Sequence, residues 1–174
     1  MDQFPPGSMT STQAGNVLCC AAALANVKKI AAENLTANAA RLDPILREGL
    51  EQIQQRHPGV VGRVTARGLV GGLQTVKAGR REPDADLAHE IVERCFHKGL
   101  LMFAPVGGWG QTVKIGPPLT IPRDALEEGL AVLSESVDEA VAAADGTADR
   151  SRQPPSRKRR ASVPQARHPA KCQP

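Results

Sequence analysis

A long run of helix formers near the start of the chain restricts the fold more than any other feature. Residues 17–33 are rich in alanine, and residues 5–16 before them are mainly proline, glycine, serine and threonine. This composition predicts a helix from about Gly15 to Glu33, interrupted at Asn34. Because its side chains are small, another helix or a sheet could approach this helix closely.

The loop before this helix has two possible roles. The ordinary one is a Ser/Thr cap on a buried helix. The alternative is an anion site, because free N–H groups, hydroxyls and the helix dipole all favour negative charge at a helix N-terminus. No Walker or dinucleotide-binding fingerprint is present to favour the second role.

Three further segments have the spacing of amphipathic helices. Residues 35–53 carry apolar side chains at helical intervals, and Pro44 inside them predicts a kink or a fresh helix start one residue earlier. Residues 84–98 form the second segment and residues 126–141 the third. Thr120, or a residue just after it, is expected to cap the last helix.

Strands are expected between these helices. Residues 60–76 are β-branched and glycine-rich, which predicts one bent strand or two short ones, with a bulge near Gly71-Gly72. Residues 100–104 predict a buried strand, and residues 112–116 a second short one. A glycine-rich phosphate cradle in the first segment is the alternative, although its glycines match no known spacing. The fold class is therefore α+β, with about four helices around a small antiparallel sheet of about three strands.

Composition limits the kind of protein. A chain of 174 residues is long enough for one domain, and with one tryptophan, three phenylalanines and no tyrosine its core must be mainly aliphatic. No apolar run reaches the roughly 18 residues of a membrane span, and residues 1–6 lack the features of a signal peptide. The four cysteines and four histidines lack metal-ligand spacing. We therefore expect no metal site, reduced cysteines and a cytoplasmic location.

Positive charge is concentrated at the C-terminal end. The net charge is +4, but residues 145–174 hold eight Lys/Arg and two Asp/Glu, whereas the rest of the chain holds fourteen and sixteen. This composition predicts a disordered basic tail from residue 145. Residues 157–162 have the look of a nuclear-localisation cluster or a basophilic kinase site. Because no aromatic residues are interleaved for base stacking, a nucleic-acid partner is not expected.

The start of the chain resembles a known family. Residues 11–17 read Ser-Thr-Gln-Ala-Gly-Asn-Val before the alanine-rich run. This is similar to the Ser/Thr-Thr-x-x-Gly-Asn-Pro sequence of class III, pyridoxal-phosphate-dependent aminotransferases, with Gln13 and Val17 as departures. In that family the threonine that matches Thr12 reaches across the dimer interface to the cofactor phosphate of the other subunit. The resemblance implies the same role for Thr12.

A second block resembles the same family. Lys98-Gly99-Leu100-Leu101 is followed by residues 113–121, Val-Lys-Ile-Gly-Pro-Pro-Leu-Thr-Ile, in the order of the family's C-terminal small domain. In many members an arginine on the second strand binds the substrate carboxylate, and Lys114 stands at that position. The resemblance implies a carboxylate contact for Lys114, which as a point charge cannot make arginine's bidentate fork. A surface lysine at a strand end is the alternative.

The resemblance also implies an organisation. Residues 1–33 would link to a missing large domain, residues 34–144 would form the small domain, and residues 145–174 would be the tail. The family's Schiff-base lysine, the aspartate partner of the cofactor and the stacking aromatic would lie upstream, so no catalytic residue is assigned here. The complete enzyme would bind pyridoxal 5'-phosphate, act on amino acids and 2-oxo acids, and form a homodimer or pair with a separate large domain.

A second hypothesis belongs to another class. The chain would be a non-catalytic interaction module, in which the alanine-rich helix pairs with a partner chain and the basic tail tethers it to an acidic surface. Either way, apolar surface meant for a partner would be exposed, and aggregation is expected when the chain is expressed alone.

Overall fold

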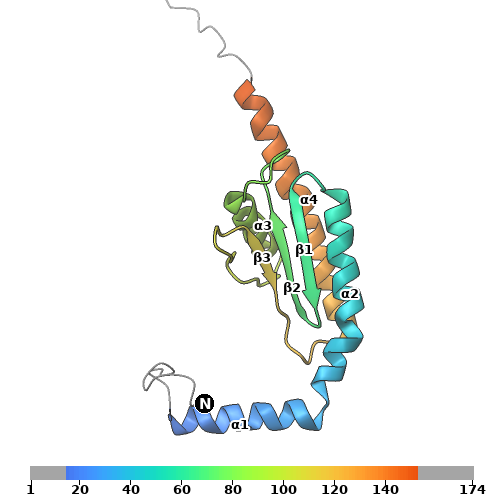
Figure 1. Ribbon diagram of the computed structural model, residues 1–174, viewed down its shortest axis with the longest axis vertical. Helices are drawn as coiled ribbons and strands as arrows, with labels where there is room; N and C mark the ends of the chain where they lie inside the picture. The colour runs from blue at the N-terminus through green and yellow to red at the C-terminus, as the bar shows by residue number, and fades with distance from the viewer. Residues whose placement is uncertain (1–14, 153–174) are drawn as a thin grey trace, which may run out of the picture.

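The computed structural model describes residues 15–152, with the side chains of residues 15–144. In this part a three-stranded sheet lies in front of α3 and α4, and α2 lies beside the sheet (Figure 1). Helix α1 projects from the lower end of α2. The elements, in chain order, are α1 (Val17–Ala32), α2 (Leu35–Arg56), β1 (Val61–Arg67), β2 (Val70–Thr75), α3 (Ala85–His97), β3 (Thr112–Ile115) and α4 (Arg123–Arg152). The α+β class predicted from the sequence is confirmed.

The first helix begins where the sequence predicts, but its cap is an asparagine. The side-chain oxygen of Asn16 accepts hydrogen bonds from the backbone N–H groups of Leu18 at 3.0 Å and Cys19 at 3.2 Å. At the other end Asn34 takes the left-handed conformation, with φ 48°, and so turns the chain into α2. No residue of α1 is buried.

The second helix runs through Pro44 without a new start, which corrects that part of the expectation. Asp43 makes no helix cap. Its carboxylate instead accepts a hydrogen bond from the N–H of Gly68, in the turn between β1 and β2. Gly68 has φ +59°, a conformation that glycine adopts without strain. The helix is thereby fixed to the hairpin that packs against it.

The sheet is antiparallel in the order β1-β2-β3. Residues 60–76 form two short strands, so β1 and β2 are a hairpin. The register shifts between Val61 and Arg63, whereas the bulge had been expected near Gly71-Gly72. Gly71 pairs regularly and faces the core, where a Cβ atom would lie 2.9 Å from the side chain of Leu50. Glycine at this position lets α2 approach the sheet closely.

Residues 100–104 do not form the predicted strand. They carry no strand assignment, and Leu101 is 82% exposed and Phe103 53% exposed. The apolar run that predicted a buried strand is therefore an irregular segment with apolar side chains on the surface. Its neighbour Val106 makes only an isolated bridge to Thr112.

The core lies between the sheet and three helices. It is aliphatic, as the composition predicts, and α1 contributes nothing to it. Its largest fully buried side chains come from α2, the sheet, α3 and α4: Leu42, Leu46, Leu50, Ile53, Leu73, Ile91 and Leu133.

The last helix differs from the sequence-based expectation at both ends. It starts at Arg123, and the carbonyl of Pro122 accepts a hydrogen bond from Leu126 N–H, so Pro122 takes the capping position. The backbone of α4 then continues to Arg152, past the expected start of the disordered tail at residue 145. The rest of that tail lies outside the described residues. None of the described helices is long and apolar enough to cross a membrane.

Candidate functional site

Lys114 stands on the face of the sheet that none of the described helices covers. It lies in β3, where burial alternates, so Val113 and Ile115 face the core and Lys114 faces out. Its register partner on β2 is Gly72, which in turn pairs with Thr65 of β1. Gly72 has no side chain but is buried, because the side chains of Thr65 and Thr112 lie over it. The ammonium group has no ion-pair partner among the described side chains.

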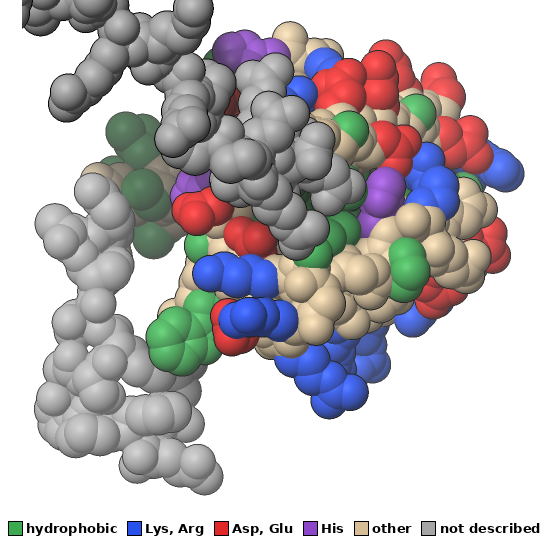
Figure 2. Space-filling model, turned by 90° about the horizontal axis from the view of Figure 1, so that it is seen from above, with side chains coloured by type: hydrophobic (Ala, Val, Ile, Leu, Met, Phe, Trp, Pro, Cys, Tyr) green, Lys and Arg blue, Asp and Glu red, His purple; other side chains and the backbone are tan. Residues whose placement is uncertain are grey.

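The open face also carries basic and polar side chains. Arg63 and Arg67 are exposed on β1, on the same side as Thr65. Figure 2 looks down from the top of Figure 1, so its lower edge corresponds to the open face, and blue Lys and Arg side chains stand out there. An anionic group that approaches this face meets positive charge first.

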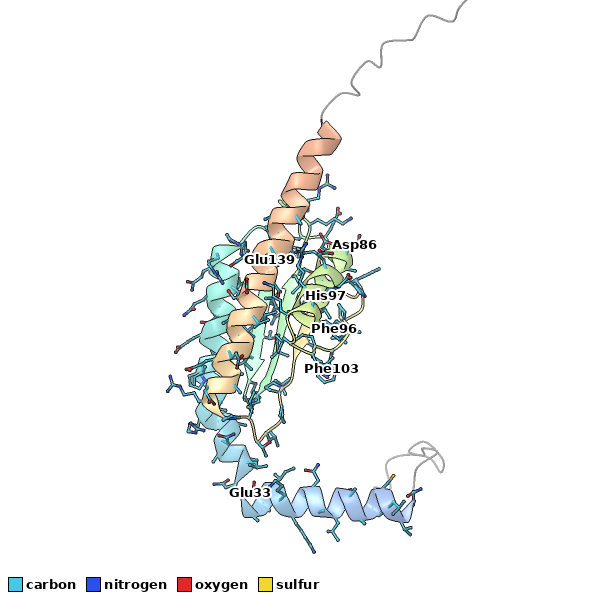
Figure 3. The ribbon with its side chains drawn as sticks, turned by 180° about the vertical axis from the view of Figure 1, so that it is seen from behind. Glu33, Asp86, Phe96, His97, Phe103 and Glu139 are labelled. Carbon is cyan, nitrogen blue, oxygen red and sulfur yellow. The ribbon has the colours of Figure 1, made fainter. Side chains whose placement is uncertain are left out.

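The aromatic ring of Phe103 contacts the ammonium group of Lys114. The Lys114 Nζ atom lies 4.8 Å from the centroid of the Phe103 ring, which is cation–π geometry. Figure 3 shows Phe103 on the segment beside β3. An apolar groove of about 450 Å³ is lined by both residues, and Lys114 is the single charged residue in this lining within the described part of the chain. Trp109 is 75% exposed and is not part of the lining.

Thr12 lies outside the described residues, so the structure does not place it relative to Lys114. The described part begins just after it, with Gly15 and Asn16. The expectation of a Ser/Thr cap on a buried helix is corrected: a side chain does cap α1, but it is that of Asn16, and no residue of this helix is buried. Two of the free N–H groups expected at this helix end are therefore already bonded to a side chain.

The phosphate cradle considered for residues 60–76 does not form. The N–H of Gly68 is bonded to a carboxylate, Gly71 faces the core, and Gly72 is buried beneath Thr65 and Thr112. These glycines make a turn, a close helix contact and a flat strand, and they do not converge on one point.

The described lysines do not fit a Schiff-base role. Lys29 pairs with Glu33 at 2.6 Å. Lys98 lies 2.8 Å from both Glu135 and Glu139, and these carboxylates raise its pKa, whereas an activated lysine needs a lowered one. Lys28 and Lys77 are exposed. Lys114 is exposed as well. We therefore assign the Schiff base to none of the described lysines.

The contacts of Lys98 serve to hold two helices together. Glu139 of α4 also meets Arg94 of α3 at 3.3 Å, and the Lys98 ammonium, followed by Arg94, lowers the pKa of the Glu139 carboxyl. Figure 3 places Glu139 on the side of α4 that faces α3. Beneath this cluster the Cys95 thiol is buried, and burial raises its pKa, which makes it unreactive.

Comparison with known proteins now decides between the two hypotheses. The model of the family described as aminotransferase class-III matches residues 1–137. The chain belongs to this family. It is 36% identical over 140 residues to a 5-aminovalerate aminotransferase of Pseudomonas aeruginosa, covering 80% of this chain and 32% of the relative. It is also 36% identical over 141 residues to a 4-aminobutyrate aminotransferase of Escherichia coli, covering 80% and 33%.

Solved structures agree with this assignment. A phospholyase from Arthrobacter in complex with phosphoethanolamine matches with a TM-score of 0.62 and 33% identity, over 66% of this chain and 27% of that one. A co-factor free transaminase matches with a TM-score of 0.66 and 26% identity, over 83% and 33%. This class III chain thus spans about a third of the length of the relatives it matches. The interaction-module hypothesis is not favoured.

Sequence reasoning missed two residues of the site. Phe103 had been assigned to a buried strand, because an apolar run looks the same whether a partner covers it or not. Asn16 was passed over for the hydroxyl residues before it, although an asparagine just ahead of an alanine-rich run is itself a capping signal.

Proposed function

We propose that this chain is the C-terminal part of a pyridoxal-phosphate-dependent aminotransferase that moves an amino group between an amino acid or amine and a 2-oxo acid. The observation that carries the proposal is the family match over residues 1–137 in a chain that spans a third of its relatives. The cofactor would supply the electron sink of transamination. The cytoplasm is its proposed location, because the cysteines have no disulfide-type pattern.

The chain would act together with an upstream large domain, joined to it or separate, in a homodimer. Residues 1–33 would link to that domain, residues 34–144 would form the small domain, and residues 145–174 the basic tail, which begins inside α4. Thr12 would contact the cofactor phosphate of the other subunit. The Schiff-base lysine would come from the upstream part, since the described lysines are paired or exposed.

Lys114 would bind the substrate carboxylate. Its side chain is exposed on the open face of the sheet, at a position that pairs with Gly72 of β2. No described carboxylate neutralises it, so its charge is available to a ligand. A carboxylate placed there would accept charge-assisted hydrogen bonds from the lysine.

The test is to co-express the full chain with the upstream two thirds of the Escherichia coli 4-aminobutyrate aminotransferase and to assay amino transfer. Lys114→Gln should raise the KM for a carboxylate-bearing amino donor by roughly tenfold or more, and Lys114→Arg should retain binding. Lys77→Gln, which removes another exposed lysine, is the control. An unchanged KM in the Lys114→Gln enzyme would show that Lys114 is only a surface residue.

The isolated chain provides a second check. It should not transfer amino groups when pyridoxal phosphate is added, because the lysine of the family's Schiff-base motif would lie in the upstream part. Transamination by the isolated chain would contradict the proposal that catalysis depends on an upstream part.

A further inference from the structure

Charge is divided between the two sides of this domain. The open face of the sheet carries Arg63, Arg67 and Lys114, all exposed. The helix side is acidic, because α3, Lys98 and residues 130–144 of α4 together hold six Asp/Glu and two Lys/Arg. In Figure 2 red Asp and Glu side chains gather toward the edge opposite the open face. A basic segment is therefore attracted to the helix side and repelled by the open face.

Five carboxylates on the helix side form what we call the acidic helix surface: Asp86, Glu90 and Glu93 of α3, and Glu135 and Glu139 of α4. On each helix they recur every three or four residues, so they share one helix face. Lys98, just after α3, lies 2.8 Å from both Glu135 and Glu139, which places the two stripes side by side. In Figure 3, Asp86 on α3 and Glu139 on α4 mark these stripes.

The cations on this surface do not balance its carboxylates. Glu135 shares the single ammonium group of Lys98 with a second carboxylate, and its side chain is 63% exposed. Asp86 is exposed and has no ion-pair partner among the described side chains. Glu93, 68% exposed, has only His97 there, at 3.8 Å. The acidic helix surface therefore has carboxylates that a further cation can contact.

We propose that the basic run of this chain, residues 157–160, docks on the acidic helix surface of the same molecule. The run reads Arg-Lys-Arg-Arg, and its four positive charges equal the excess of carboxylates over cations on the helix side. Residues 150–174 hold eight Lys/Arg and no Asp/Glu, so no acidic side chain in this part of the tail competes for the run. The inference does not depend on the proposed function, because it involves neither the cofactor nor the upstream part.

The point where the tail begins places the run within reach of this surface. Helix α4 ends at Arg152, and at about 1.5 Å per residue Glu139 and Glu135 lie roughly 20 and 26 Å back along the helix. Between Arg152 and the two ends of the run, an extended chain spans at most roughly 17 and 28 Å. A chain that turns back along α4 therefore brings the run to the level of these carboxylates.

Attachment to α4 favours this occupant over a separate partner. A short tether holds a segment at an effective concentration of about millimolar, so even weak contacts are made repeatedly. Exposed ion pairs are individually weak and are screened by salt, so docking depends on several of them acting together. Residues 1–14 contain no Lys/Arg and offer no competing basic segment.

Carbodiimide cross-linking of the full chain tests the docking, because this reagent joins a lysine directly to a carboxylate in contact with it. Lys158 lies within the run. Its cross-links to the acidic helix surface, identified by mass spectrometry, should exceed those to Glu48 and Glu51, exposed on α2, by tenfold or more. Lys98, 2.8 Å from Glu135, is the internal positive control. Equal yields on α2 and on the acidic helix surface overturn the inference.

Salt and isotope labelling identify the cause and the origin of the cross-links. Sodium chloride at about 0.5 M should reduce the Lys158 cross-links fivefold or more and retain those of the half-buried Lys98, because salt screens exposed charges most. In an equal mixture of ¹⁴N- and ¹⁵N-labelled chains, the joined peptides should carry the same isotope. Salt-resistant Lys158 cross-links overturn the inference. So do mixed-isotope pairs as abundant as matched ones, which would identify the tail of a second copy as the occupant.

A matched pair of variants separates the run from the net charge of the chain. The test variant neutralises the three arginines of the run and keeps Lys158: Arg157→Gln, Arg159→Gln and Arg160→Gln. The control neutralises three exposed arginines outside the tail: Arg63→Gln, Arg67→Gln and Arg81→Gln. Lys98 cross-links show that both variants keep α3 packed on α4. We expect the test variant to lose Lys158 cross-links to the acidic helix surface tenfold or more and the control to retain them; equal yields in the two variants overturn the inference.

Discussion

The carboxylate of Asp43, in the middle of α2, accepts a hydrogen bond from the backbone N–H of Gly68, in the turn between β1 and β2. Arg47, one helical turn later, pairs with the same carboxylate at 3.1 Å and donates a hydrogen bond to the carbonyl of Ala66. Helix and hairpin are thus connected by a charged group where Pro44 removes a helix N–H. We therefore expect this connection between helix and hairpin to weaken as the pH falls.

Asp43→Asn should reduce stability in a pH-dependent way. The Arg47 side chain, followed by the Gly68 N–H, lowers the pKa of the Asp43 carboxyl below its ordinary value, against the opposing effect of burial. A group whose pKa is lower in the folded state stabilises the fold above its unfolded pKa, about 4, and this stabilisation is lost as the pH falls through the folded pKa. The difference between wild type and Asp43→Asn should therefore be largest near neutral pH and shrink toward about pH 2.

The measurement is urea unfolding across that pH range. The control is Glu51→Gln, at an exposed position on the same helix without an ion pair among the described residues. Its unfolding free energy should vary with pH in the same way as that of the wild type. A difference between wild type and Asp43→Asn that is constant with pH would show that the hydrogen bonds do not depend on the charge.

Two leucine truncations should differ sharply. Leu50 is fully buried, so Leu50→Ala should cost about 2–5 kcal/mol in unfolding free energy, from lost burial and the cavity left behind. Leu101 is 82% exposed in the described chain, so Leu101→Ala should change it by less than about 0.5 kcal/mol. Denaturant unfolding of the full chain measures both. A large loss of unfolding free energy in Leu101→Ala would instead support the buried strand that was expected from the sequence.

The contrast between these leucines shows how far the sequence could predict this fold. Leu50 belongs to a helical pattern of apolar residues that recurs over several turns, and such a pattern specifies both the element and its buried face. Leu101 belongs to an apolar run of only five residues. A run this short does not distinguish a buried strand from an irregular segment with exposed apolar side chains.

The site was predictable to a similar degree. The sequence placed Lys114 on a short strand, and the alternation of Val113 and Ile115 about it predicts which way it faces. The contact with Phe103 joins residues across an irregular turn, and no periodicity specifies where such a turn brings its two ends. Thr12 lies outside the described residues, so its role remains a prediction from the family resemblance.

The contact between Lys114 and Phe103 should be visible by nuclear magnetic resonance. With the ammonium 4.8 Å from the ring centroid, the terminal methylene protons of Lys114 should be shifted upfield by the ring current. Phe103→Leu keeps an apolar side chain but removes the ring, so the shift should vanish and stability should fall by at most about 1 kcal/mol. Phe96→Leu, an exposed phenylalanine on α3, is the control. A Lys114 spectrum unchanged in Phe103→Leu would mean that the contact is not populated.

Self-association of the isolated chain should depend on α1. Val17, Leu18, Leu24 and Val27 are each more than half exposed on this helix, and exposed apolar side chains gathered on one element favour association. The double change Leu24→Lys and Val27→Lys should weaken association by more than about tenfold, because burial of even one such side chain is worth about 1.5–3 kcal/mol. Gln52→Lys with Gln55→Lys, also exposed and three residues apart on α2, adds the same charge without removing apolar surface. Sedimentation velocity over a range of concentrations compares the three chains. If the α2 pair reduces association as much as the α1 pair, net charge is the cause and the apolar surface of α1 is not.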